Sequence, residues 1–198
     1  MVFDLLTSLI LVFRNFFLLI FSPYRTMRRI SRESDYGQVF VIFLTIFLYF
    51  KFVYFLRDKP YPATLTFLVF ILHFSLTAAF FYFLARALDK TIKFSGLVFT
   101  LSYSLLPTLI WFASSSILYI IVPPPRFLTF LGKGFSIFFI AYSFSLLSWK
   151  IILMYLALRF STRAGFYRII YLIVLFLLWF IPYSLILYYY KIFRIPFI

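Results

Sequence analysis

Residues 169–190 read IIYLIVLFLLWFIPYSLILYYY, a run of 22 residues without one charged side chain. A helix needs about 20 consecutive, mainly apolar residues to cross the hydrocarbon core of a bilayer. Four more apolar runs approach or exceed this length, at about residues 38–56, 65–85, 94–122 and 135–158. The sequence therefore predicts an all-α fold, a polytopic transmembrane helical bundle with five spans.

The composition of the chain agrees with this prediction. Hydrophobic residues make up 65% of its 198 residues, whereas about half of the residues of a soluble domain are apolar. An outer-membrane barrel would show alternating segments of about ten residues, but these runs are longer and apolar on every face. We expect two regions: residues 1–37, with an interfacial amphipathic helix and a basic juxtamembrane helix, and residues 38–190, the five-helix transmembrane domain.

The charges predict how the chain lies in the membrane. It carries 19 Lys and Arg against 5 Asp and Glu, and most basic residues lie between the apolar runs, where they anchor helix ends and meet anionic lipid head groups. Eleven fall on the side of the N-terminus and seven on the other side, which predicts a cytoplasmic N-terminus and a C-terminus outside. We expect no nucleic-acid partner, because no soluble fold is available to carry a basic patch.

The first 21 residues combine an apolar cluster with two charges. Asp4 and Arg14 bracket a run of nine residues, which is too short for a span. This pattern predicts an amphipathic helix at the membrane interface. Its apolar face would lie at the acyl boundary, and its polar residues would face water: Asp4, Thr7, Ser8, Arg14 and Asn15. A sixth, tilted span over residues 3–21 is the alternative, since the apolar run resumes after Asn15.

A second short helix is expected after Ser22 and Pro23, which suit the N-cap and the first helical position. It extends to about residue 33 and carries four arginines: Arg25, Arg28, Arg29 and Arg32. Their simplest interpretation is a positive-inside anchor. The clustering also suits a more specific interpretation, a juxtamembrane surface that contacts anionic lipids or a partner protein.

Proline interrupts two of the predicted spans. Pro107 lies near the centre of residues 94–122, where it cannot donate to the carbonyl of Tyr103 and is expected to kink the helix. Pro182 is expected to kink the last span in the same way. Residues 114–116 are serines and give the third span a small, hydroxylated stripe. This stripe predicts tight helix packing, with a polar transport path as the alternative.

Few residues could carry chemistry inside the membrane. The five acids lie at or outside the helix ends and the chain has no Cys, so we expect no catalytic residue, metal or cofactor and predict that the protein is not an enzyme. The candidate intramembrane polar site consists of His73, Lys150, Ser102 and Pro107. For His73 we favour a neutral ring bonded to a hydroxyl or carbonyl over a proton relay. For Lys150 we favour snorkelling over pairing with a substrate or with His73.

Two stretches resemble the Yip1-domain family of five-span membrane proteins. The first is NFFLLIFSPYRTMRRISRESDYGQ at residues 15–38, with a Ser-Pro stop and a basic stretch before span one. The second is LVFTLSYSLLPTLI at residues 97–110, a Ser/Tyr-rich span with a proline after paired leucines. The resemblance covers about residues 14–190. It implies a five-helix bundle without known catalysis that acts as an adaptor or organiser in a membrane.

Eukaryotic members of this family are associated with vesicle traffic and Rab-type GTPases. Of their Asp-Leu-Tyr-Gly-Pro motif this chain holds only a fragment, Asp35-Tyr36-Gly37, and its compact form is similar to prokaryotic relatives. Our first hypothesis is a non-enzymatic adaptor, organiser or accessory subunit that binds anionic lipids and other integral membrane proteins or itself. The alternative is a transporter or channel component with a midplane site near His73 and Pro107, and a membrane enzyme ranks third.

Overall fold

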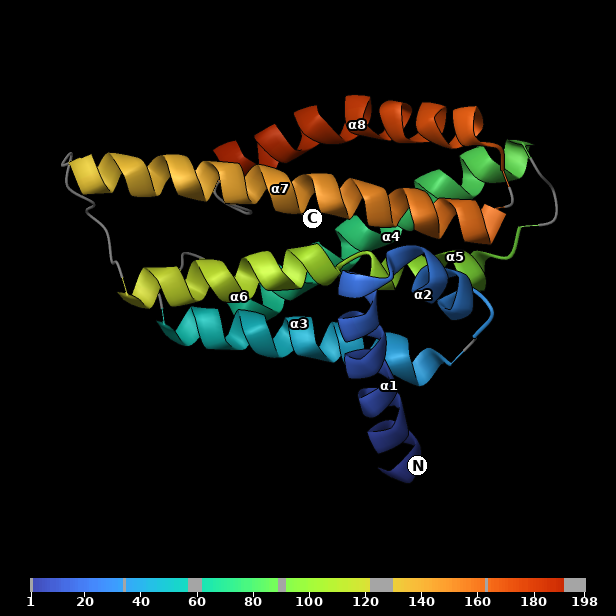
Figure 1. Cartoon of the computed structure of the whole chain (residues 1–198), viewed down its shortest axis with the longest axis horizontal. Coiled ribbons are helices and arrows are strands. Elements are labelled where there is room, and N and C mark those ends of the chain that lie inside the picture. Colours follow the sequence, from blue (N-terminus) through green and yellow to red (C-terminus); the bar gives the residue numbers. More distant parts are fainter. Residues whose placement is uncertain are drawn as a thin grey trace.

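The computed structural model describes residues 2–33, 35–56, 62–88, 92–121, 130–162 and 164–190, and their helices form one bundle (Figure 1). The helices are α1 (Val2–Phe21), α2 (Pro23–Ile30), α3 (Tyr36–Leu56), α4 (Ala63–Leu88), α5 (Phe94–Tyr103), α6 (Leu106–Ile121), α7 (Phe130–Thr162) and α8 (Phe166–Tyr189). No strand occurs in this described part of the chain. The all-α prediction is confirmed.

Five helical segments of the described residues are long and apolar enough to cross a membrane. They are Tyr36–Leu56, Ala63–Ala87, Phe94–Leu118, Gly132–Thr162 and Phe166–Tyr189. Each overlaps one predicted span, although residue 122, the predicted end of the third, lies outside the described residues. The helix α7 has 33 residues and is about 50 Å long, more than the hydrocarbon core of about 30 Å. The protein is therefore a multi-pass membrane protein.

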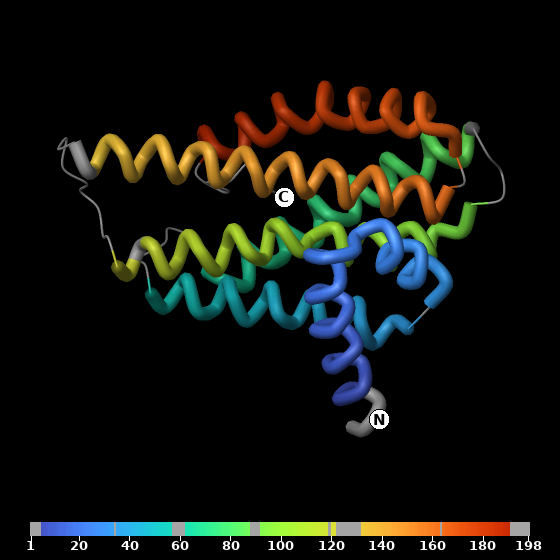
Figure 2. Tube along the Cα trace, viewed as in Figure 1, coloured from blue at the N-terminus to red at the C-terminus, as the bar shows by residue number. Residues whose placement is uncertain are grey.

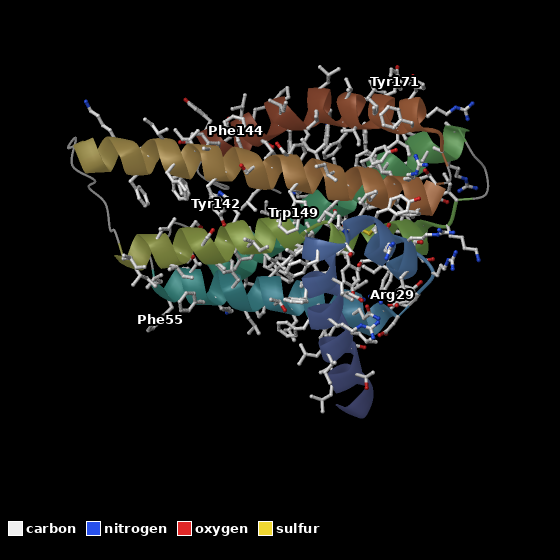
Figure 3. All side chains as sticks on the ribbon, viewed as in Figure 1. Arg29, Phe55, Tyr142, Phe144, Trp149 and Tyr171 are labelled. Carbon is white, nitrogen blue, oxygen red and sulfur yellow. The ribbon has the colours of Figure 1, made fainter. Side chains whose placement is uncertain are left out.

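The third span, made of α5 and α6, forms the centre of the bundle. In the most apolar 18-residue segment of this span, 67% is buried inside the protein, whereas the corresponding share is 28% or less in each of the other four spans. The helix α5 packs against α2, α3, α4 and α7, and α6 packs against α3 and α7. The outer spans turn large side chains away from the protein, as Phe55, Phe144 and Tyr171 illustrate (Figure 3). Lipid chains would surround these exposed faces.

The third span is interrupted where proline was expected to kink it. The helix α5 ends at Tyr103 and α6 begins at Leu106. The two residues between them form a turn, and their N–H groups bond to carbonyl oxygens three residues back. Pro107 has no N–H group that could donate a hydrogen bond to the Tyr103 carbonyl. The hydrogen bonds of the turn, each to the carbonyl three residues earlier, are tighter than those of an α-helix and accommodate the missing bond. The predicted kink is confirmed, in the form of a break between two helices.

Pro182 is accommodated differently. The helix α8 continues through it without interruption, and Figure 2 shows α8 following a bowed course. Pro182 is exposed, whereas Pro107 is buried at the centre of the bundle. A helix with an exposed side can curve gently over several turns. A central helix has neighbours on all sides, so the change in direction is confined to the single turn between α5 and α6.

The helix α1 lies across the bundle instead of along it. In Figures 1 and 2 it runs steeply to the long axis of α3, against which it packs. Its apolar part, Leu5–Phe21, is shorter than the five spans. This geometry favours an interfacial helix over a sixth span, because a helix perpendicular to the spans lies parallel to the membrane plane.

Part of the polar face of α1 is turned the opposite way from the prediction. Ser8 and Asn15 are buried against the bundle, whereas three large apolar side chains are exposed: Ile10, Phe13 and Phe17. Thr7 and Arg14 are exposed as predicted, and the side chain of Asp4 lies outside the described residues. The prediction for Ser8 and Asn15 was wrong because an amphipathic pattern shows that two faces exist, not which of them meets the protein.

Candidate functional site

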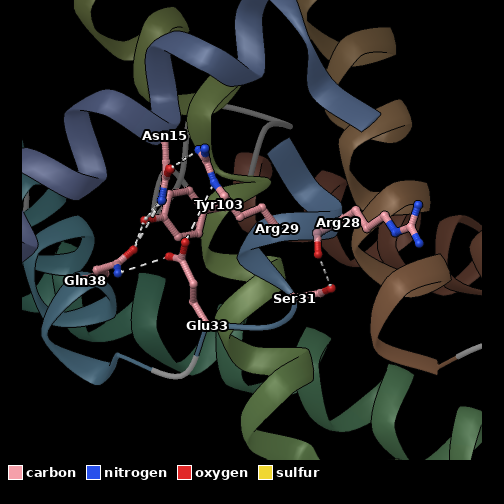
Figure 4. A network of polar contacts seen from close by, with 7 residues as sticks. All are labelled: Asn15, Arg28, Arg29, Ser31, Glu33, Gln38 and Tyr103. Carbon is pink, nitrogen blue, oxygen red and sulfur yellow. Dashed lines mark hydrogen bonds and ion pairs between the residues drawn. The ribbon is translucent and has the colours of Figure 1, made fainter. Parts of the chain in front are cut away.

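A buried polar network joins α1, α3 and α5 (Figure 4). At its centre the side chain of Tyr103 is fully buried, and its hydroxyl donates to Gln38 Oε1. Asn15 Nδ2 donates to the Tyr103 hydroxyl at 3.1 Å and lies 3.4 Å from Gln38 Oε1. Asn15 and Gln38 are the only asparagine and the only glutamine of the chain, and both are buried. The two amide side chains thus meet at one point and hold three helices together.

Arg29 and Glu33 carry this network to α2 and the surface. Arg29 Nη2 donates to Asn15 Oδ1 at 2.7 Å, and Arg29 Nε lies 3.8 Å from Glu33 Oε1. Gln38 Nε2 donates to the other carboxylate oxygen of Glu33 at 3.4 Å. Hydrogen bonds with an ionised donor are the strong ones. One predicted surface arginine, Arg29, is therefore turned inward, and it fixes α2 on the bundle.

The helices α1 and α3 approach each other closely at Gly37. Asp35 accepts a hydrogen bond from Ser8 Oγ at 2.7 Å with one carboxylate oxygen and one from the Gly37 N–H at 2.9 Å with the other. A Cβ atom at position 37 would lie 2.5 Å from Ser8 Oγ, closer than non-bonded atoms approach. Asp35 and Gly37 are thus structural residues that dock α1.

The other three predicted arginines, Arg25, Arg28 and Arg32, are exposed. We call these three side chains the arginine surface. With Arg29 and Glu33 they line a pocket of about 470 Å³. Guanidinium groups arranged around one space can bind phosphate or carboxylate groups through paired hydrogen bonds. The structure therefore brings the predicted arginines together, with one of the four committed to the bundle.

The opposite face of α2 is packed against the protein. Met27 and Ile30 are fully buried there. Ser22 and Pro23 occupy the predicted N-cap and first helical positions, although the Ser22 side chain makes no capping hydrogen bond. The helix ends at Ile30, about one turn before the predicted end. Because one face is buried and Arg29 is bonded, the arginine surface has a defined orientation.

A second cavity, of about 450 Å³, lies between α4, α5, α7 and α8. Its walls are mainly apolar, and the polar side chains among them are Thr77, Ser104, Lys150, Ser184 and Tyr188. Lys150 therefore stands on the wall of an intramembrane cavity. This is the one member of the predicted polar site that lines the cavity.

His73 lies beside this cavity and not on its wall. Its ring is 3% exposed and packs between Phe180, at 5.0 Å between ring centres, and Tyr183, at 4.9 Å. Neither ring nitrogen has a hydrogen-bond partner among the described residues, so the bonded ring that we favoured from sequence is wrong. Lys150 and His73 are both basic, and two basic side chains repel and form no ion pair.

Ser102 and Pro107 are buried in the third span and do not line this cavity. Ser102 Oγ donates to the carbonyl of Val98 in its own helix at 2.8 Å. A serine that bonds back into its own helix is satisfied locally. The four predicted members of the polar site therefore do not line one common cavity.

The serines of α6 make contacts between spans. Tyr142 on α7 donates to Ser114 Oγ at 3.0 Å, and the hydroxyls of Tyr49 on α3 and Ser116 lie 2.9 Å apart. Trp111 on α6 donates to Ser143 on α7 at 3.0 Å. Hydroxyl contacts of this kind hold membrane helices together. They support the packing interpretation of this stripe over a transport path.

The sequence did not single out the network around Tyr103. One signal was present, because the asparagine and the glutamine are the only side-chain amides in the sequence. Their separation along the chain concealed that they meet. Among the described residues no group of three or more His, Cys, Asp or Glu could hold a metal ion.

Comparisons of the chain with protein-family models, with curated proteins and with solved structures found no match. The resemblance to the Yip1-domain family therefore stays a prediction that rests on the two quoted stretches.

Proposed function

We propose that this chain is a non-enzymatic, Yip1-like integral membrane protein that acts as an adaptor, organiser or accessory subunit of a membrane protein complex. The observation that carries the proposal is the construction of α2. Arg29 is bonded into the buried network through Asn15, while Arg25 and Arg28 on the same short helix, and Arg32 two residues after its end, remain exposed. A charged surface with a fixed orientation suits contact with a partner better than a flexible anchor does.

The charge of this surface indicates what it contacts. Three exposed guanidinium groups favour anionic lipid head groups or acidic segments of a partner, at about 1 kcal/mol for each basic residue near an anionic membrane surface. The exposed apolar faces of the outer spans supply additional area for helix contacts with another membrane protein or with a second copy. The absence of carboxylates from the predicted spans supports a role without catalysis.

In the orientation that we propose, the arginine surface lies on the cytoplasmic side. The excess of basic residues on the side of the N-terminus supports this orientation. With five spans between them, α2 and the end of α8 fall on opposite sides of the membrane. The adaptor would then meet its partner or anionic lipid at the inner leaflet.

Detergent-free extraction of the native protein, followed by mass spectrometry of its protein and lipid companions, tests the proposal. The informative variant is the triple change Arg25→Gln, Arg28→Gln and Arg32→Gln. A matched control removes three charges from the same side at exposed positions of other helix ends: Arg86→Gln, Lys93→Gln and Arg168→Gln. We expect a stoichiometric partner protein with the wild type and the control, and its loss with the arginine variant. A wild type that carries no partner protein, or equal retention by both variants, would overturn the proposal.

The alternative function is that of a transporter or channel component, and the cavity beside Lys150 favours it. A polar group on the wall of a cavity within the spans is where such proteins bind their substrate. Reconstitution into vesicles separates the two functions. A solute flux that Lys150→Met abolishes would establish transport, whereas an adaptor shows no flux that depends on this residue.

A further inference from the structure

We propose that the cavity between α4, α5, α7 and α8 binds a single-chain amphiphile with an anionic head group, with the head at the ammonium of Lys150 and the chain along α8. This inference goes beyond the proposed function and does not depend on it. It rests on the place of the cavity, the chemistry of its walls and its shape.

The cavity has a buried inner wall and an exposed outer rim. Phe74 of α4 and Leu101 of α5 form part of the inner wall and are buried. Ile181, Leu185 and Tyr188 of α8 line the other side, and each is more than half exposed. A ligand can therefore enter past α8 from the acyl region of the bilayer, where an amphiphile already resides. The volume of the cavity, about 450 Å³, lies in the range of small-molecule sites.

The polar groups of the walls select the charge of the head group. Thr77 and Ser104 line the cavity, but their hydroxyls donate to backbone carbonyls, Thr77 to that of His73 at 3.0 Å and Ser104 to that of Leu101 at 2.7 Å. Lys150 brings three N–H donors and a positive charge. The wall carries no carboxylate among its described residues. A carboxylate or phosphate head is attracted to this wall and a cationic head is repelled.

The low dielectric of the site strengthens this selection. Charges interact more strongly in an apolar surrounding than in water. An anionic head group beside Lys150 on this mainly apolar wall therefore gains an attraction to the ammonium. A neutral ester or alcohol of the same chain length gains only the apolar part of the contact.

The shape of the cavity indicates one long chain. The residues of α8 that line it run from Phe176 to Tyr188, which is about 18 Å along the helix at about 1.5 Å per residue. Most of the side chains along this length are apolar, such as Phe180 and Leu177. An extended acyl chain fits an elongated apolar space better than a compact polar solute does.

The first experiment compares an acid with its ester. The protein is reconstituted in phosphatidylcholine nanodiscs and titrated with dibromostearic acid or its methyl ester, while quenching of the tryptophan fluorescence is followed. Trp149 is adjacent to Lys150 in the sequence, and Trp179 lies on α8 between the lining residues Leu177 and Phe180, so we expect bromine atoms held in the cavity to quench the tryptophan fluorescence. We expect the acid to bind about tenfold or more tightly than the ester, as one hydrogen bond to a charged group implies. Equal affinities, or no saturable quenching, would overturn the proposal.

Two variants locate the binding. Lys150→Met keeps the length of the side chain and removes its charge, and we expect it to abolish the preference for the acid while ester binding stays unchanged. The matched control is Lys133→Met, because Lys133 is an exposed lysine on the same helix. A Lys150→Met protein that still prefers the acid would place the binding elsewhere and sink the proposal.

A competition step identifies the head group. Unlabelled stearic acid and unlabelled lysophosphatidic acid are added to the complex with the brominated acid. Displacement by the fatty acid alone identifies a carboxylate head, and displacement by both identifies a site for anionic heads in general. Displacement by neither compound would overturn the proposal, because the quenching would then come from probe dissolved in the bilayer.

Discussion

The two halves of the third span have different surroundings. The helix α5 lies among α2, α3, α4 and α7, and its last residue, Tyr103, is the centre of a buried network of hydrogen bonds. The helix α6 lies between α3 and α7 and is held by isolated pairs such as Tyr49 with Ser116. The cavity takes its polar wall residue Ser104 from the turn between them.

This difference shows how the third span combines a fixed part, the network around Tyr103, with an adaptable part, the side of α5 and its turn that borders the cavity. Around Tyr103 most polar groups have partners from several helices, so a shift of one helix would leave buried groups unsatisfied. The hydroxyl contacts of α6 described above each join only two helices, and the cavity, which adjoins α5 and the turn after it, leaves space beside α8. The network suits an anchored surface, and the space beside α8 suits a site that admits a ligand.

The largest effect is expected from breaking the network at Asn15. Asn15→Ala removes the bonds to Arg29 and Tyr103 and leaves a charged donor without its acceptor. We expect a loss of about 3 kcal/mol of stability, seen as a lower Tm in nanodiscs by circular dichroism. Ser145→Ala is the control, because Ser145 is exposed and bonds back into its own helix, and it should change stability by less than about 0.5 kcal/mol. An unchanged Tm for Asn15→Ala would show that the network does not hold α1.

The second change tests the close packing of α1 against α3 at Gly37. Gly37→Ala places a methyl group 2.5 Å from Ser8 Oγ, and we expect overpacking to cost about 1 to 3 kcal/mol. Protease accessibility of α1 measures the consequence, since a displaced α1 is cut faster. Gly96→Ala is the matched control, because its added Cβ would meet no atom within 4 Å. Equal cleavage rates for the two variants would contradict the close approach.

A third change tests the adaptable part, and we expect it to raise the stability of the protein instead of lowering it. Ser184→Leu adds apolar volume to the wall of the cavity, and we expect it to stabilise the ligand-free protein by about 1 kcal/mol, as cavity filling does. Thermal unfolding of delipidated protein measures it. Ser148→Leu is an exposed control on α7. A lower Tm for Ser184→Leu would mean that this space is already filled by packing.

The smallest effect is expected for a single hydroxyl pair. Ser116→Ala removes the 2.9 Å contact with Tyr49 and should cost about 1 kcal/mol. The same unfolding assay measures it, with Ser136→Ala as a control whose hydroxyl bonds to its own helix. A loss as large as that of Asn15→Ala would remove the contrast between the two halves of the span.

Sequence patterns predicted the parts of the fold that depend on local chemistry. The five spans follow from the length of the apolar runs, and the break before Pro107 follows from a missing N–H. The candidate site was predicted less well. The arginines of α2 are together as expected, but Arg29 is turned inward, and Lys150 lies apart from Ser102 and Pro107. These outcomes depend on which helix faces meet.

The sequence by itself determined that this protein is a multi-pass helical membrane protein, because a helix satisfies its own backbone within each apolar run. Only the tertiary structure decided that Asn15, Gln38 and Tyr103 form one network, that α1 buries Ser8 and Asn15 and that Lys150 lines a cavity. The physical reason is that apolar spans carry little information about their partners. Helix association in lipid depends on packing and on a few polar contacts between residues far apart in the chain.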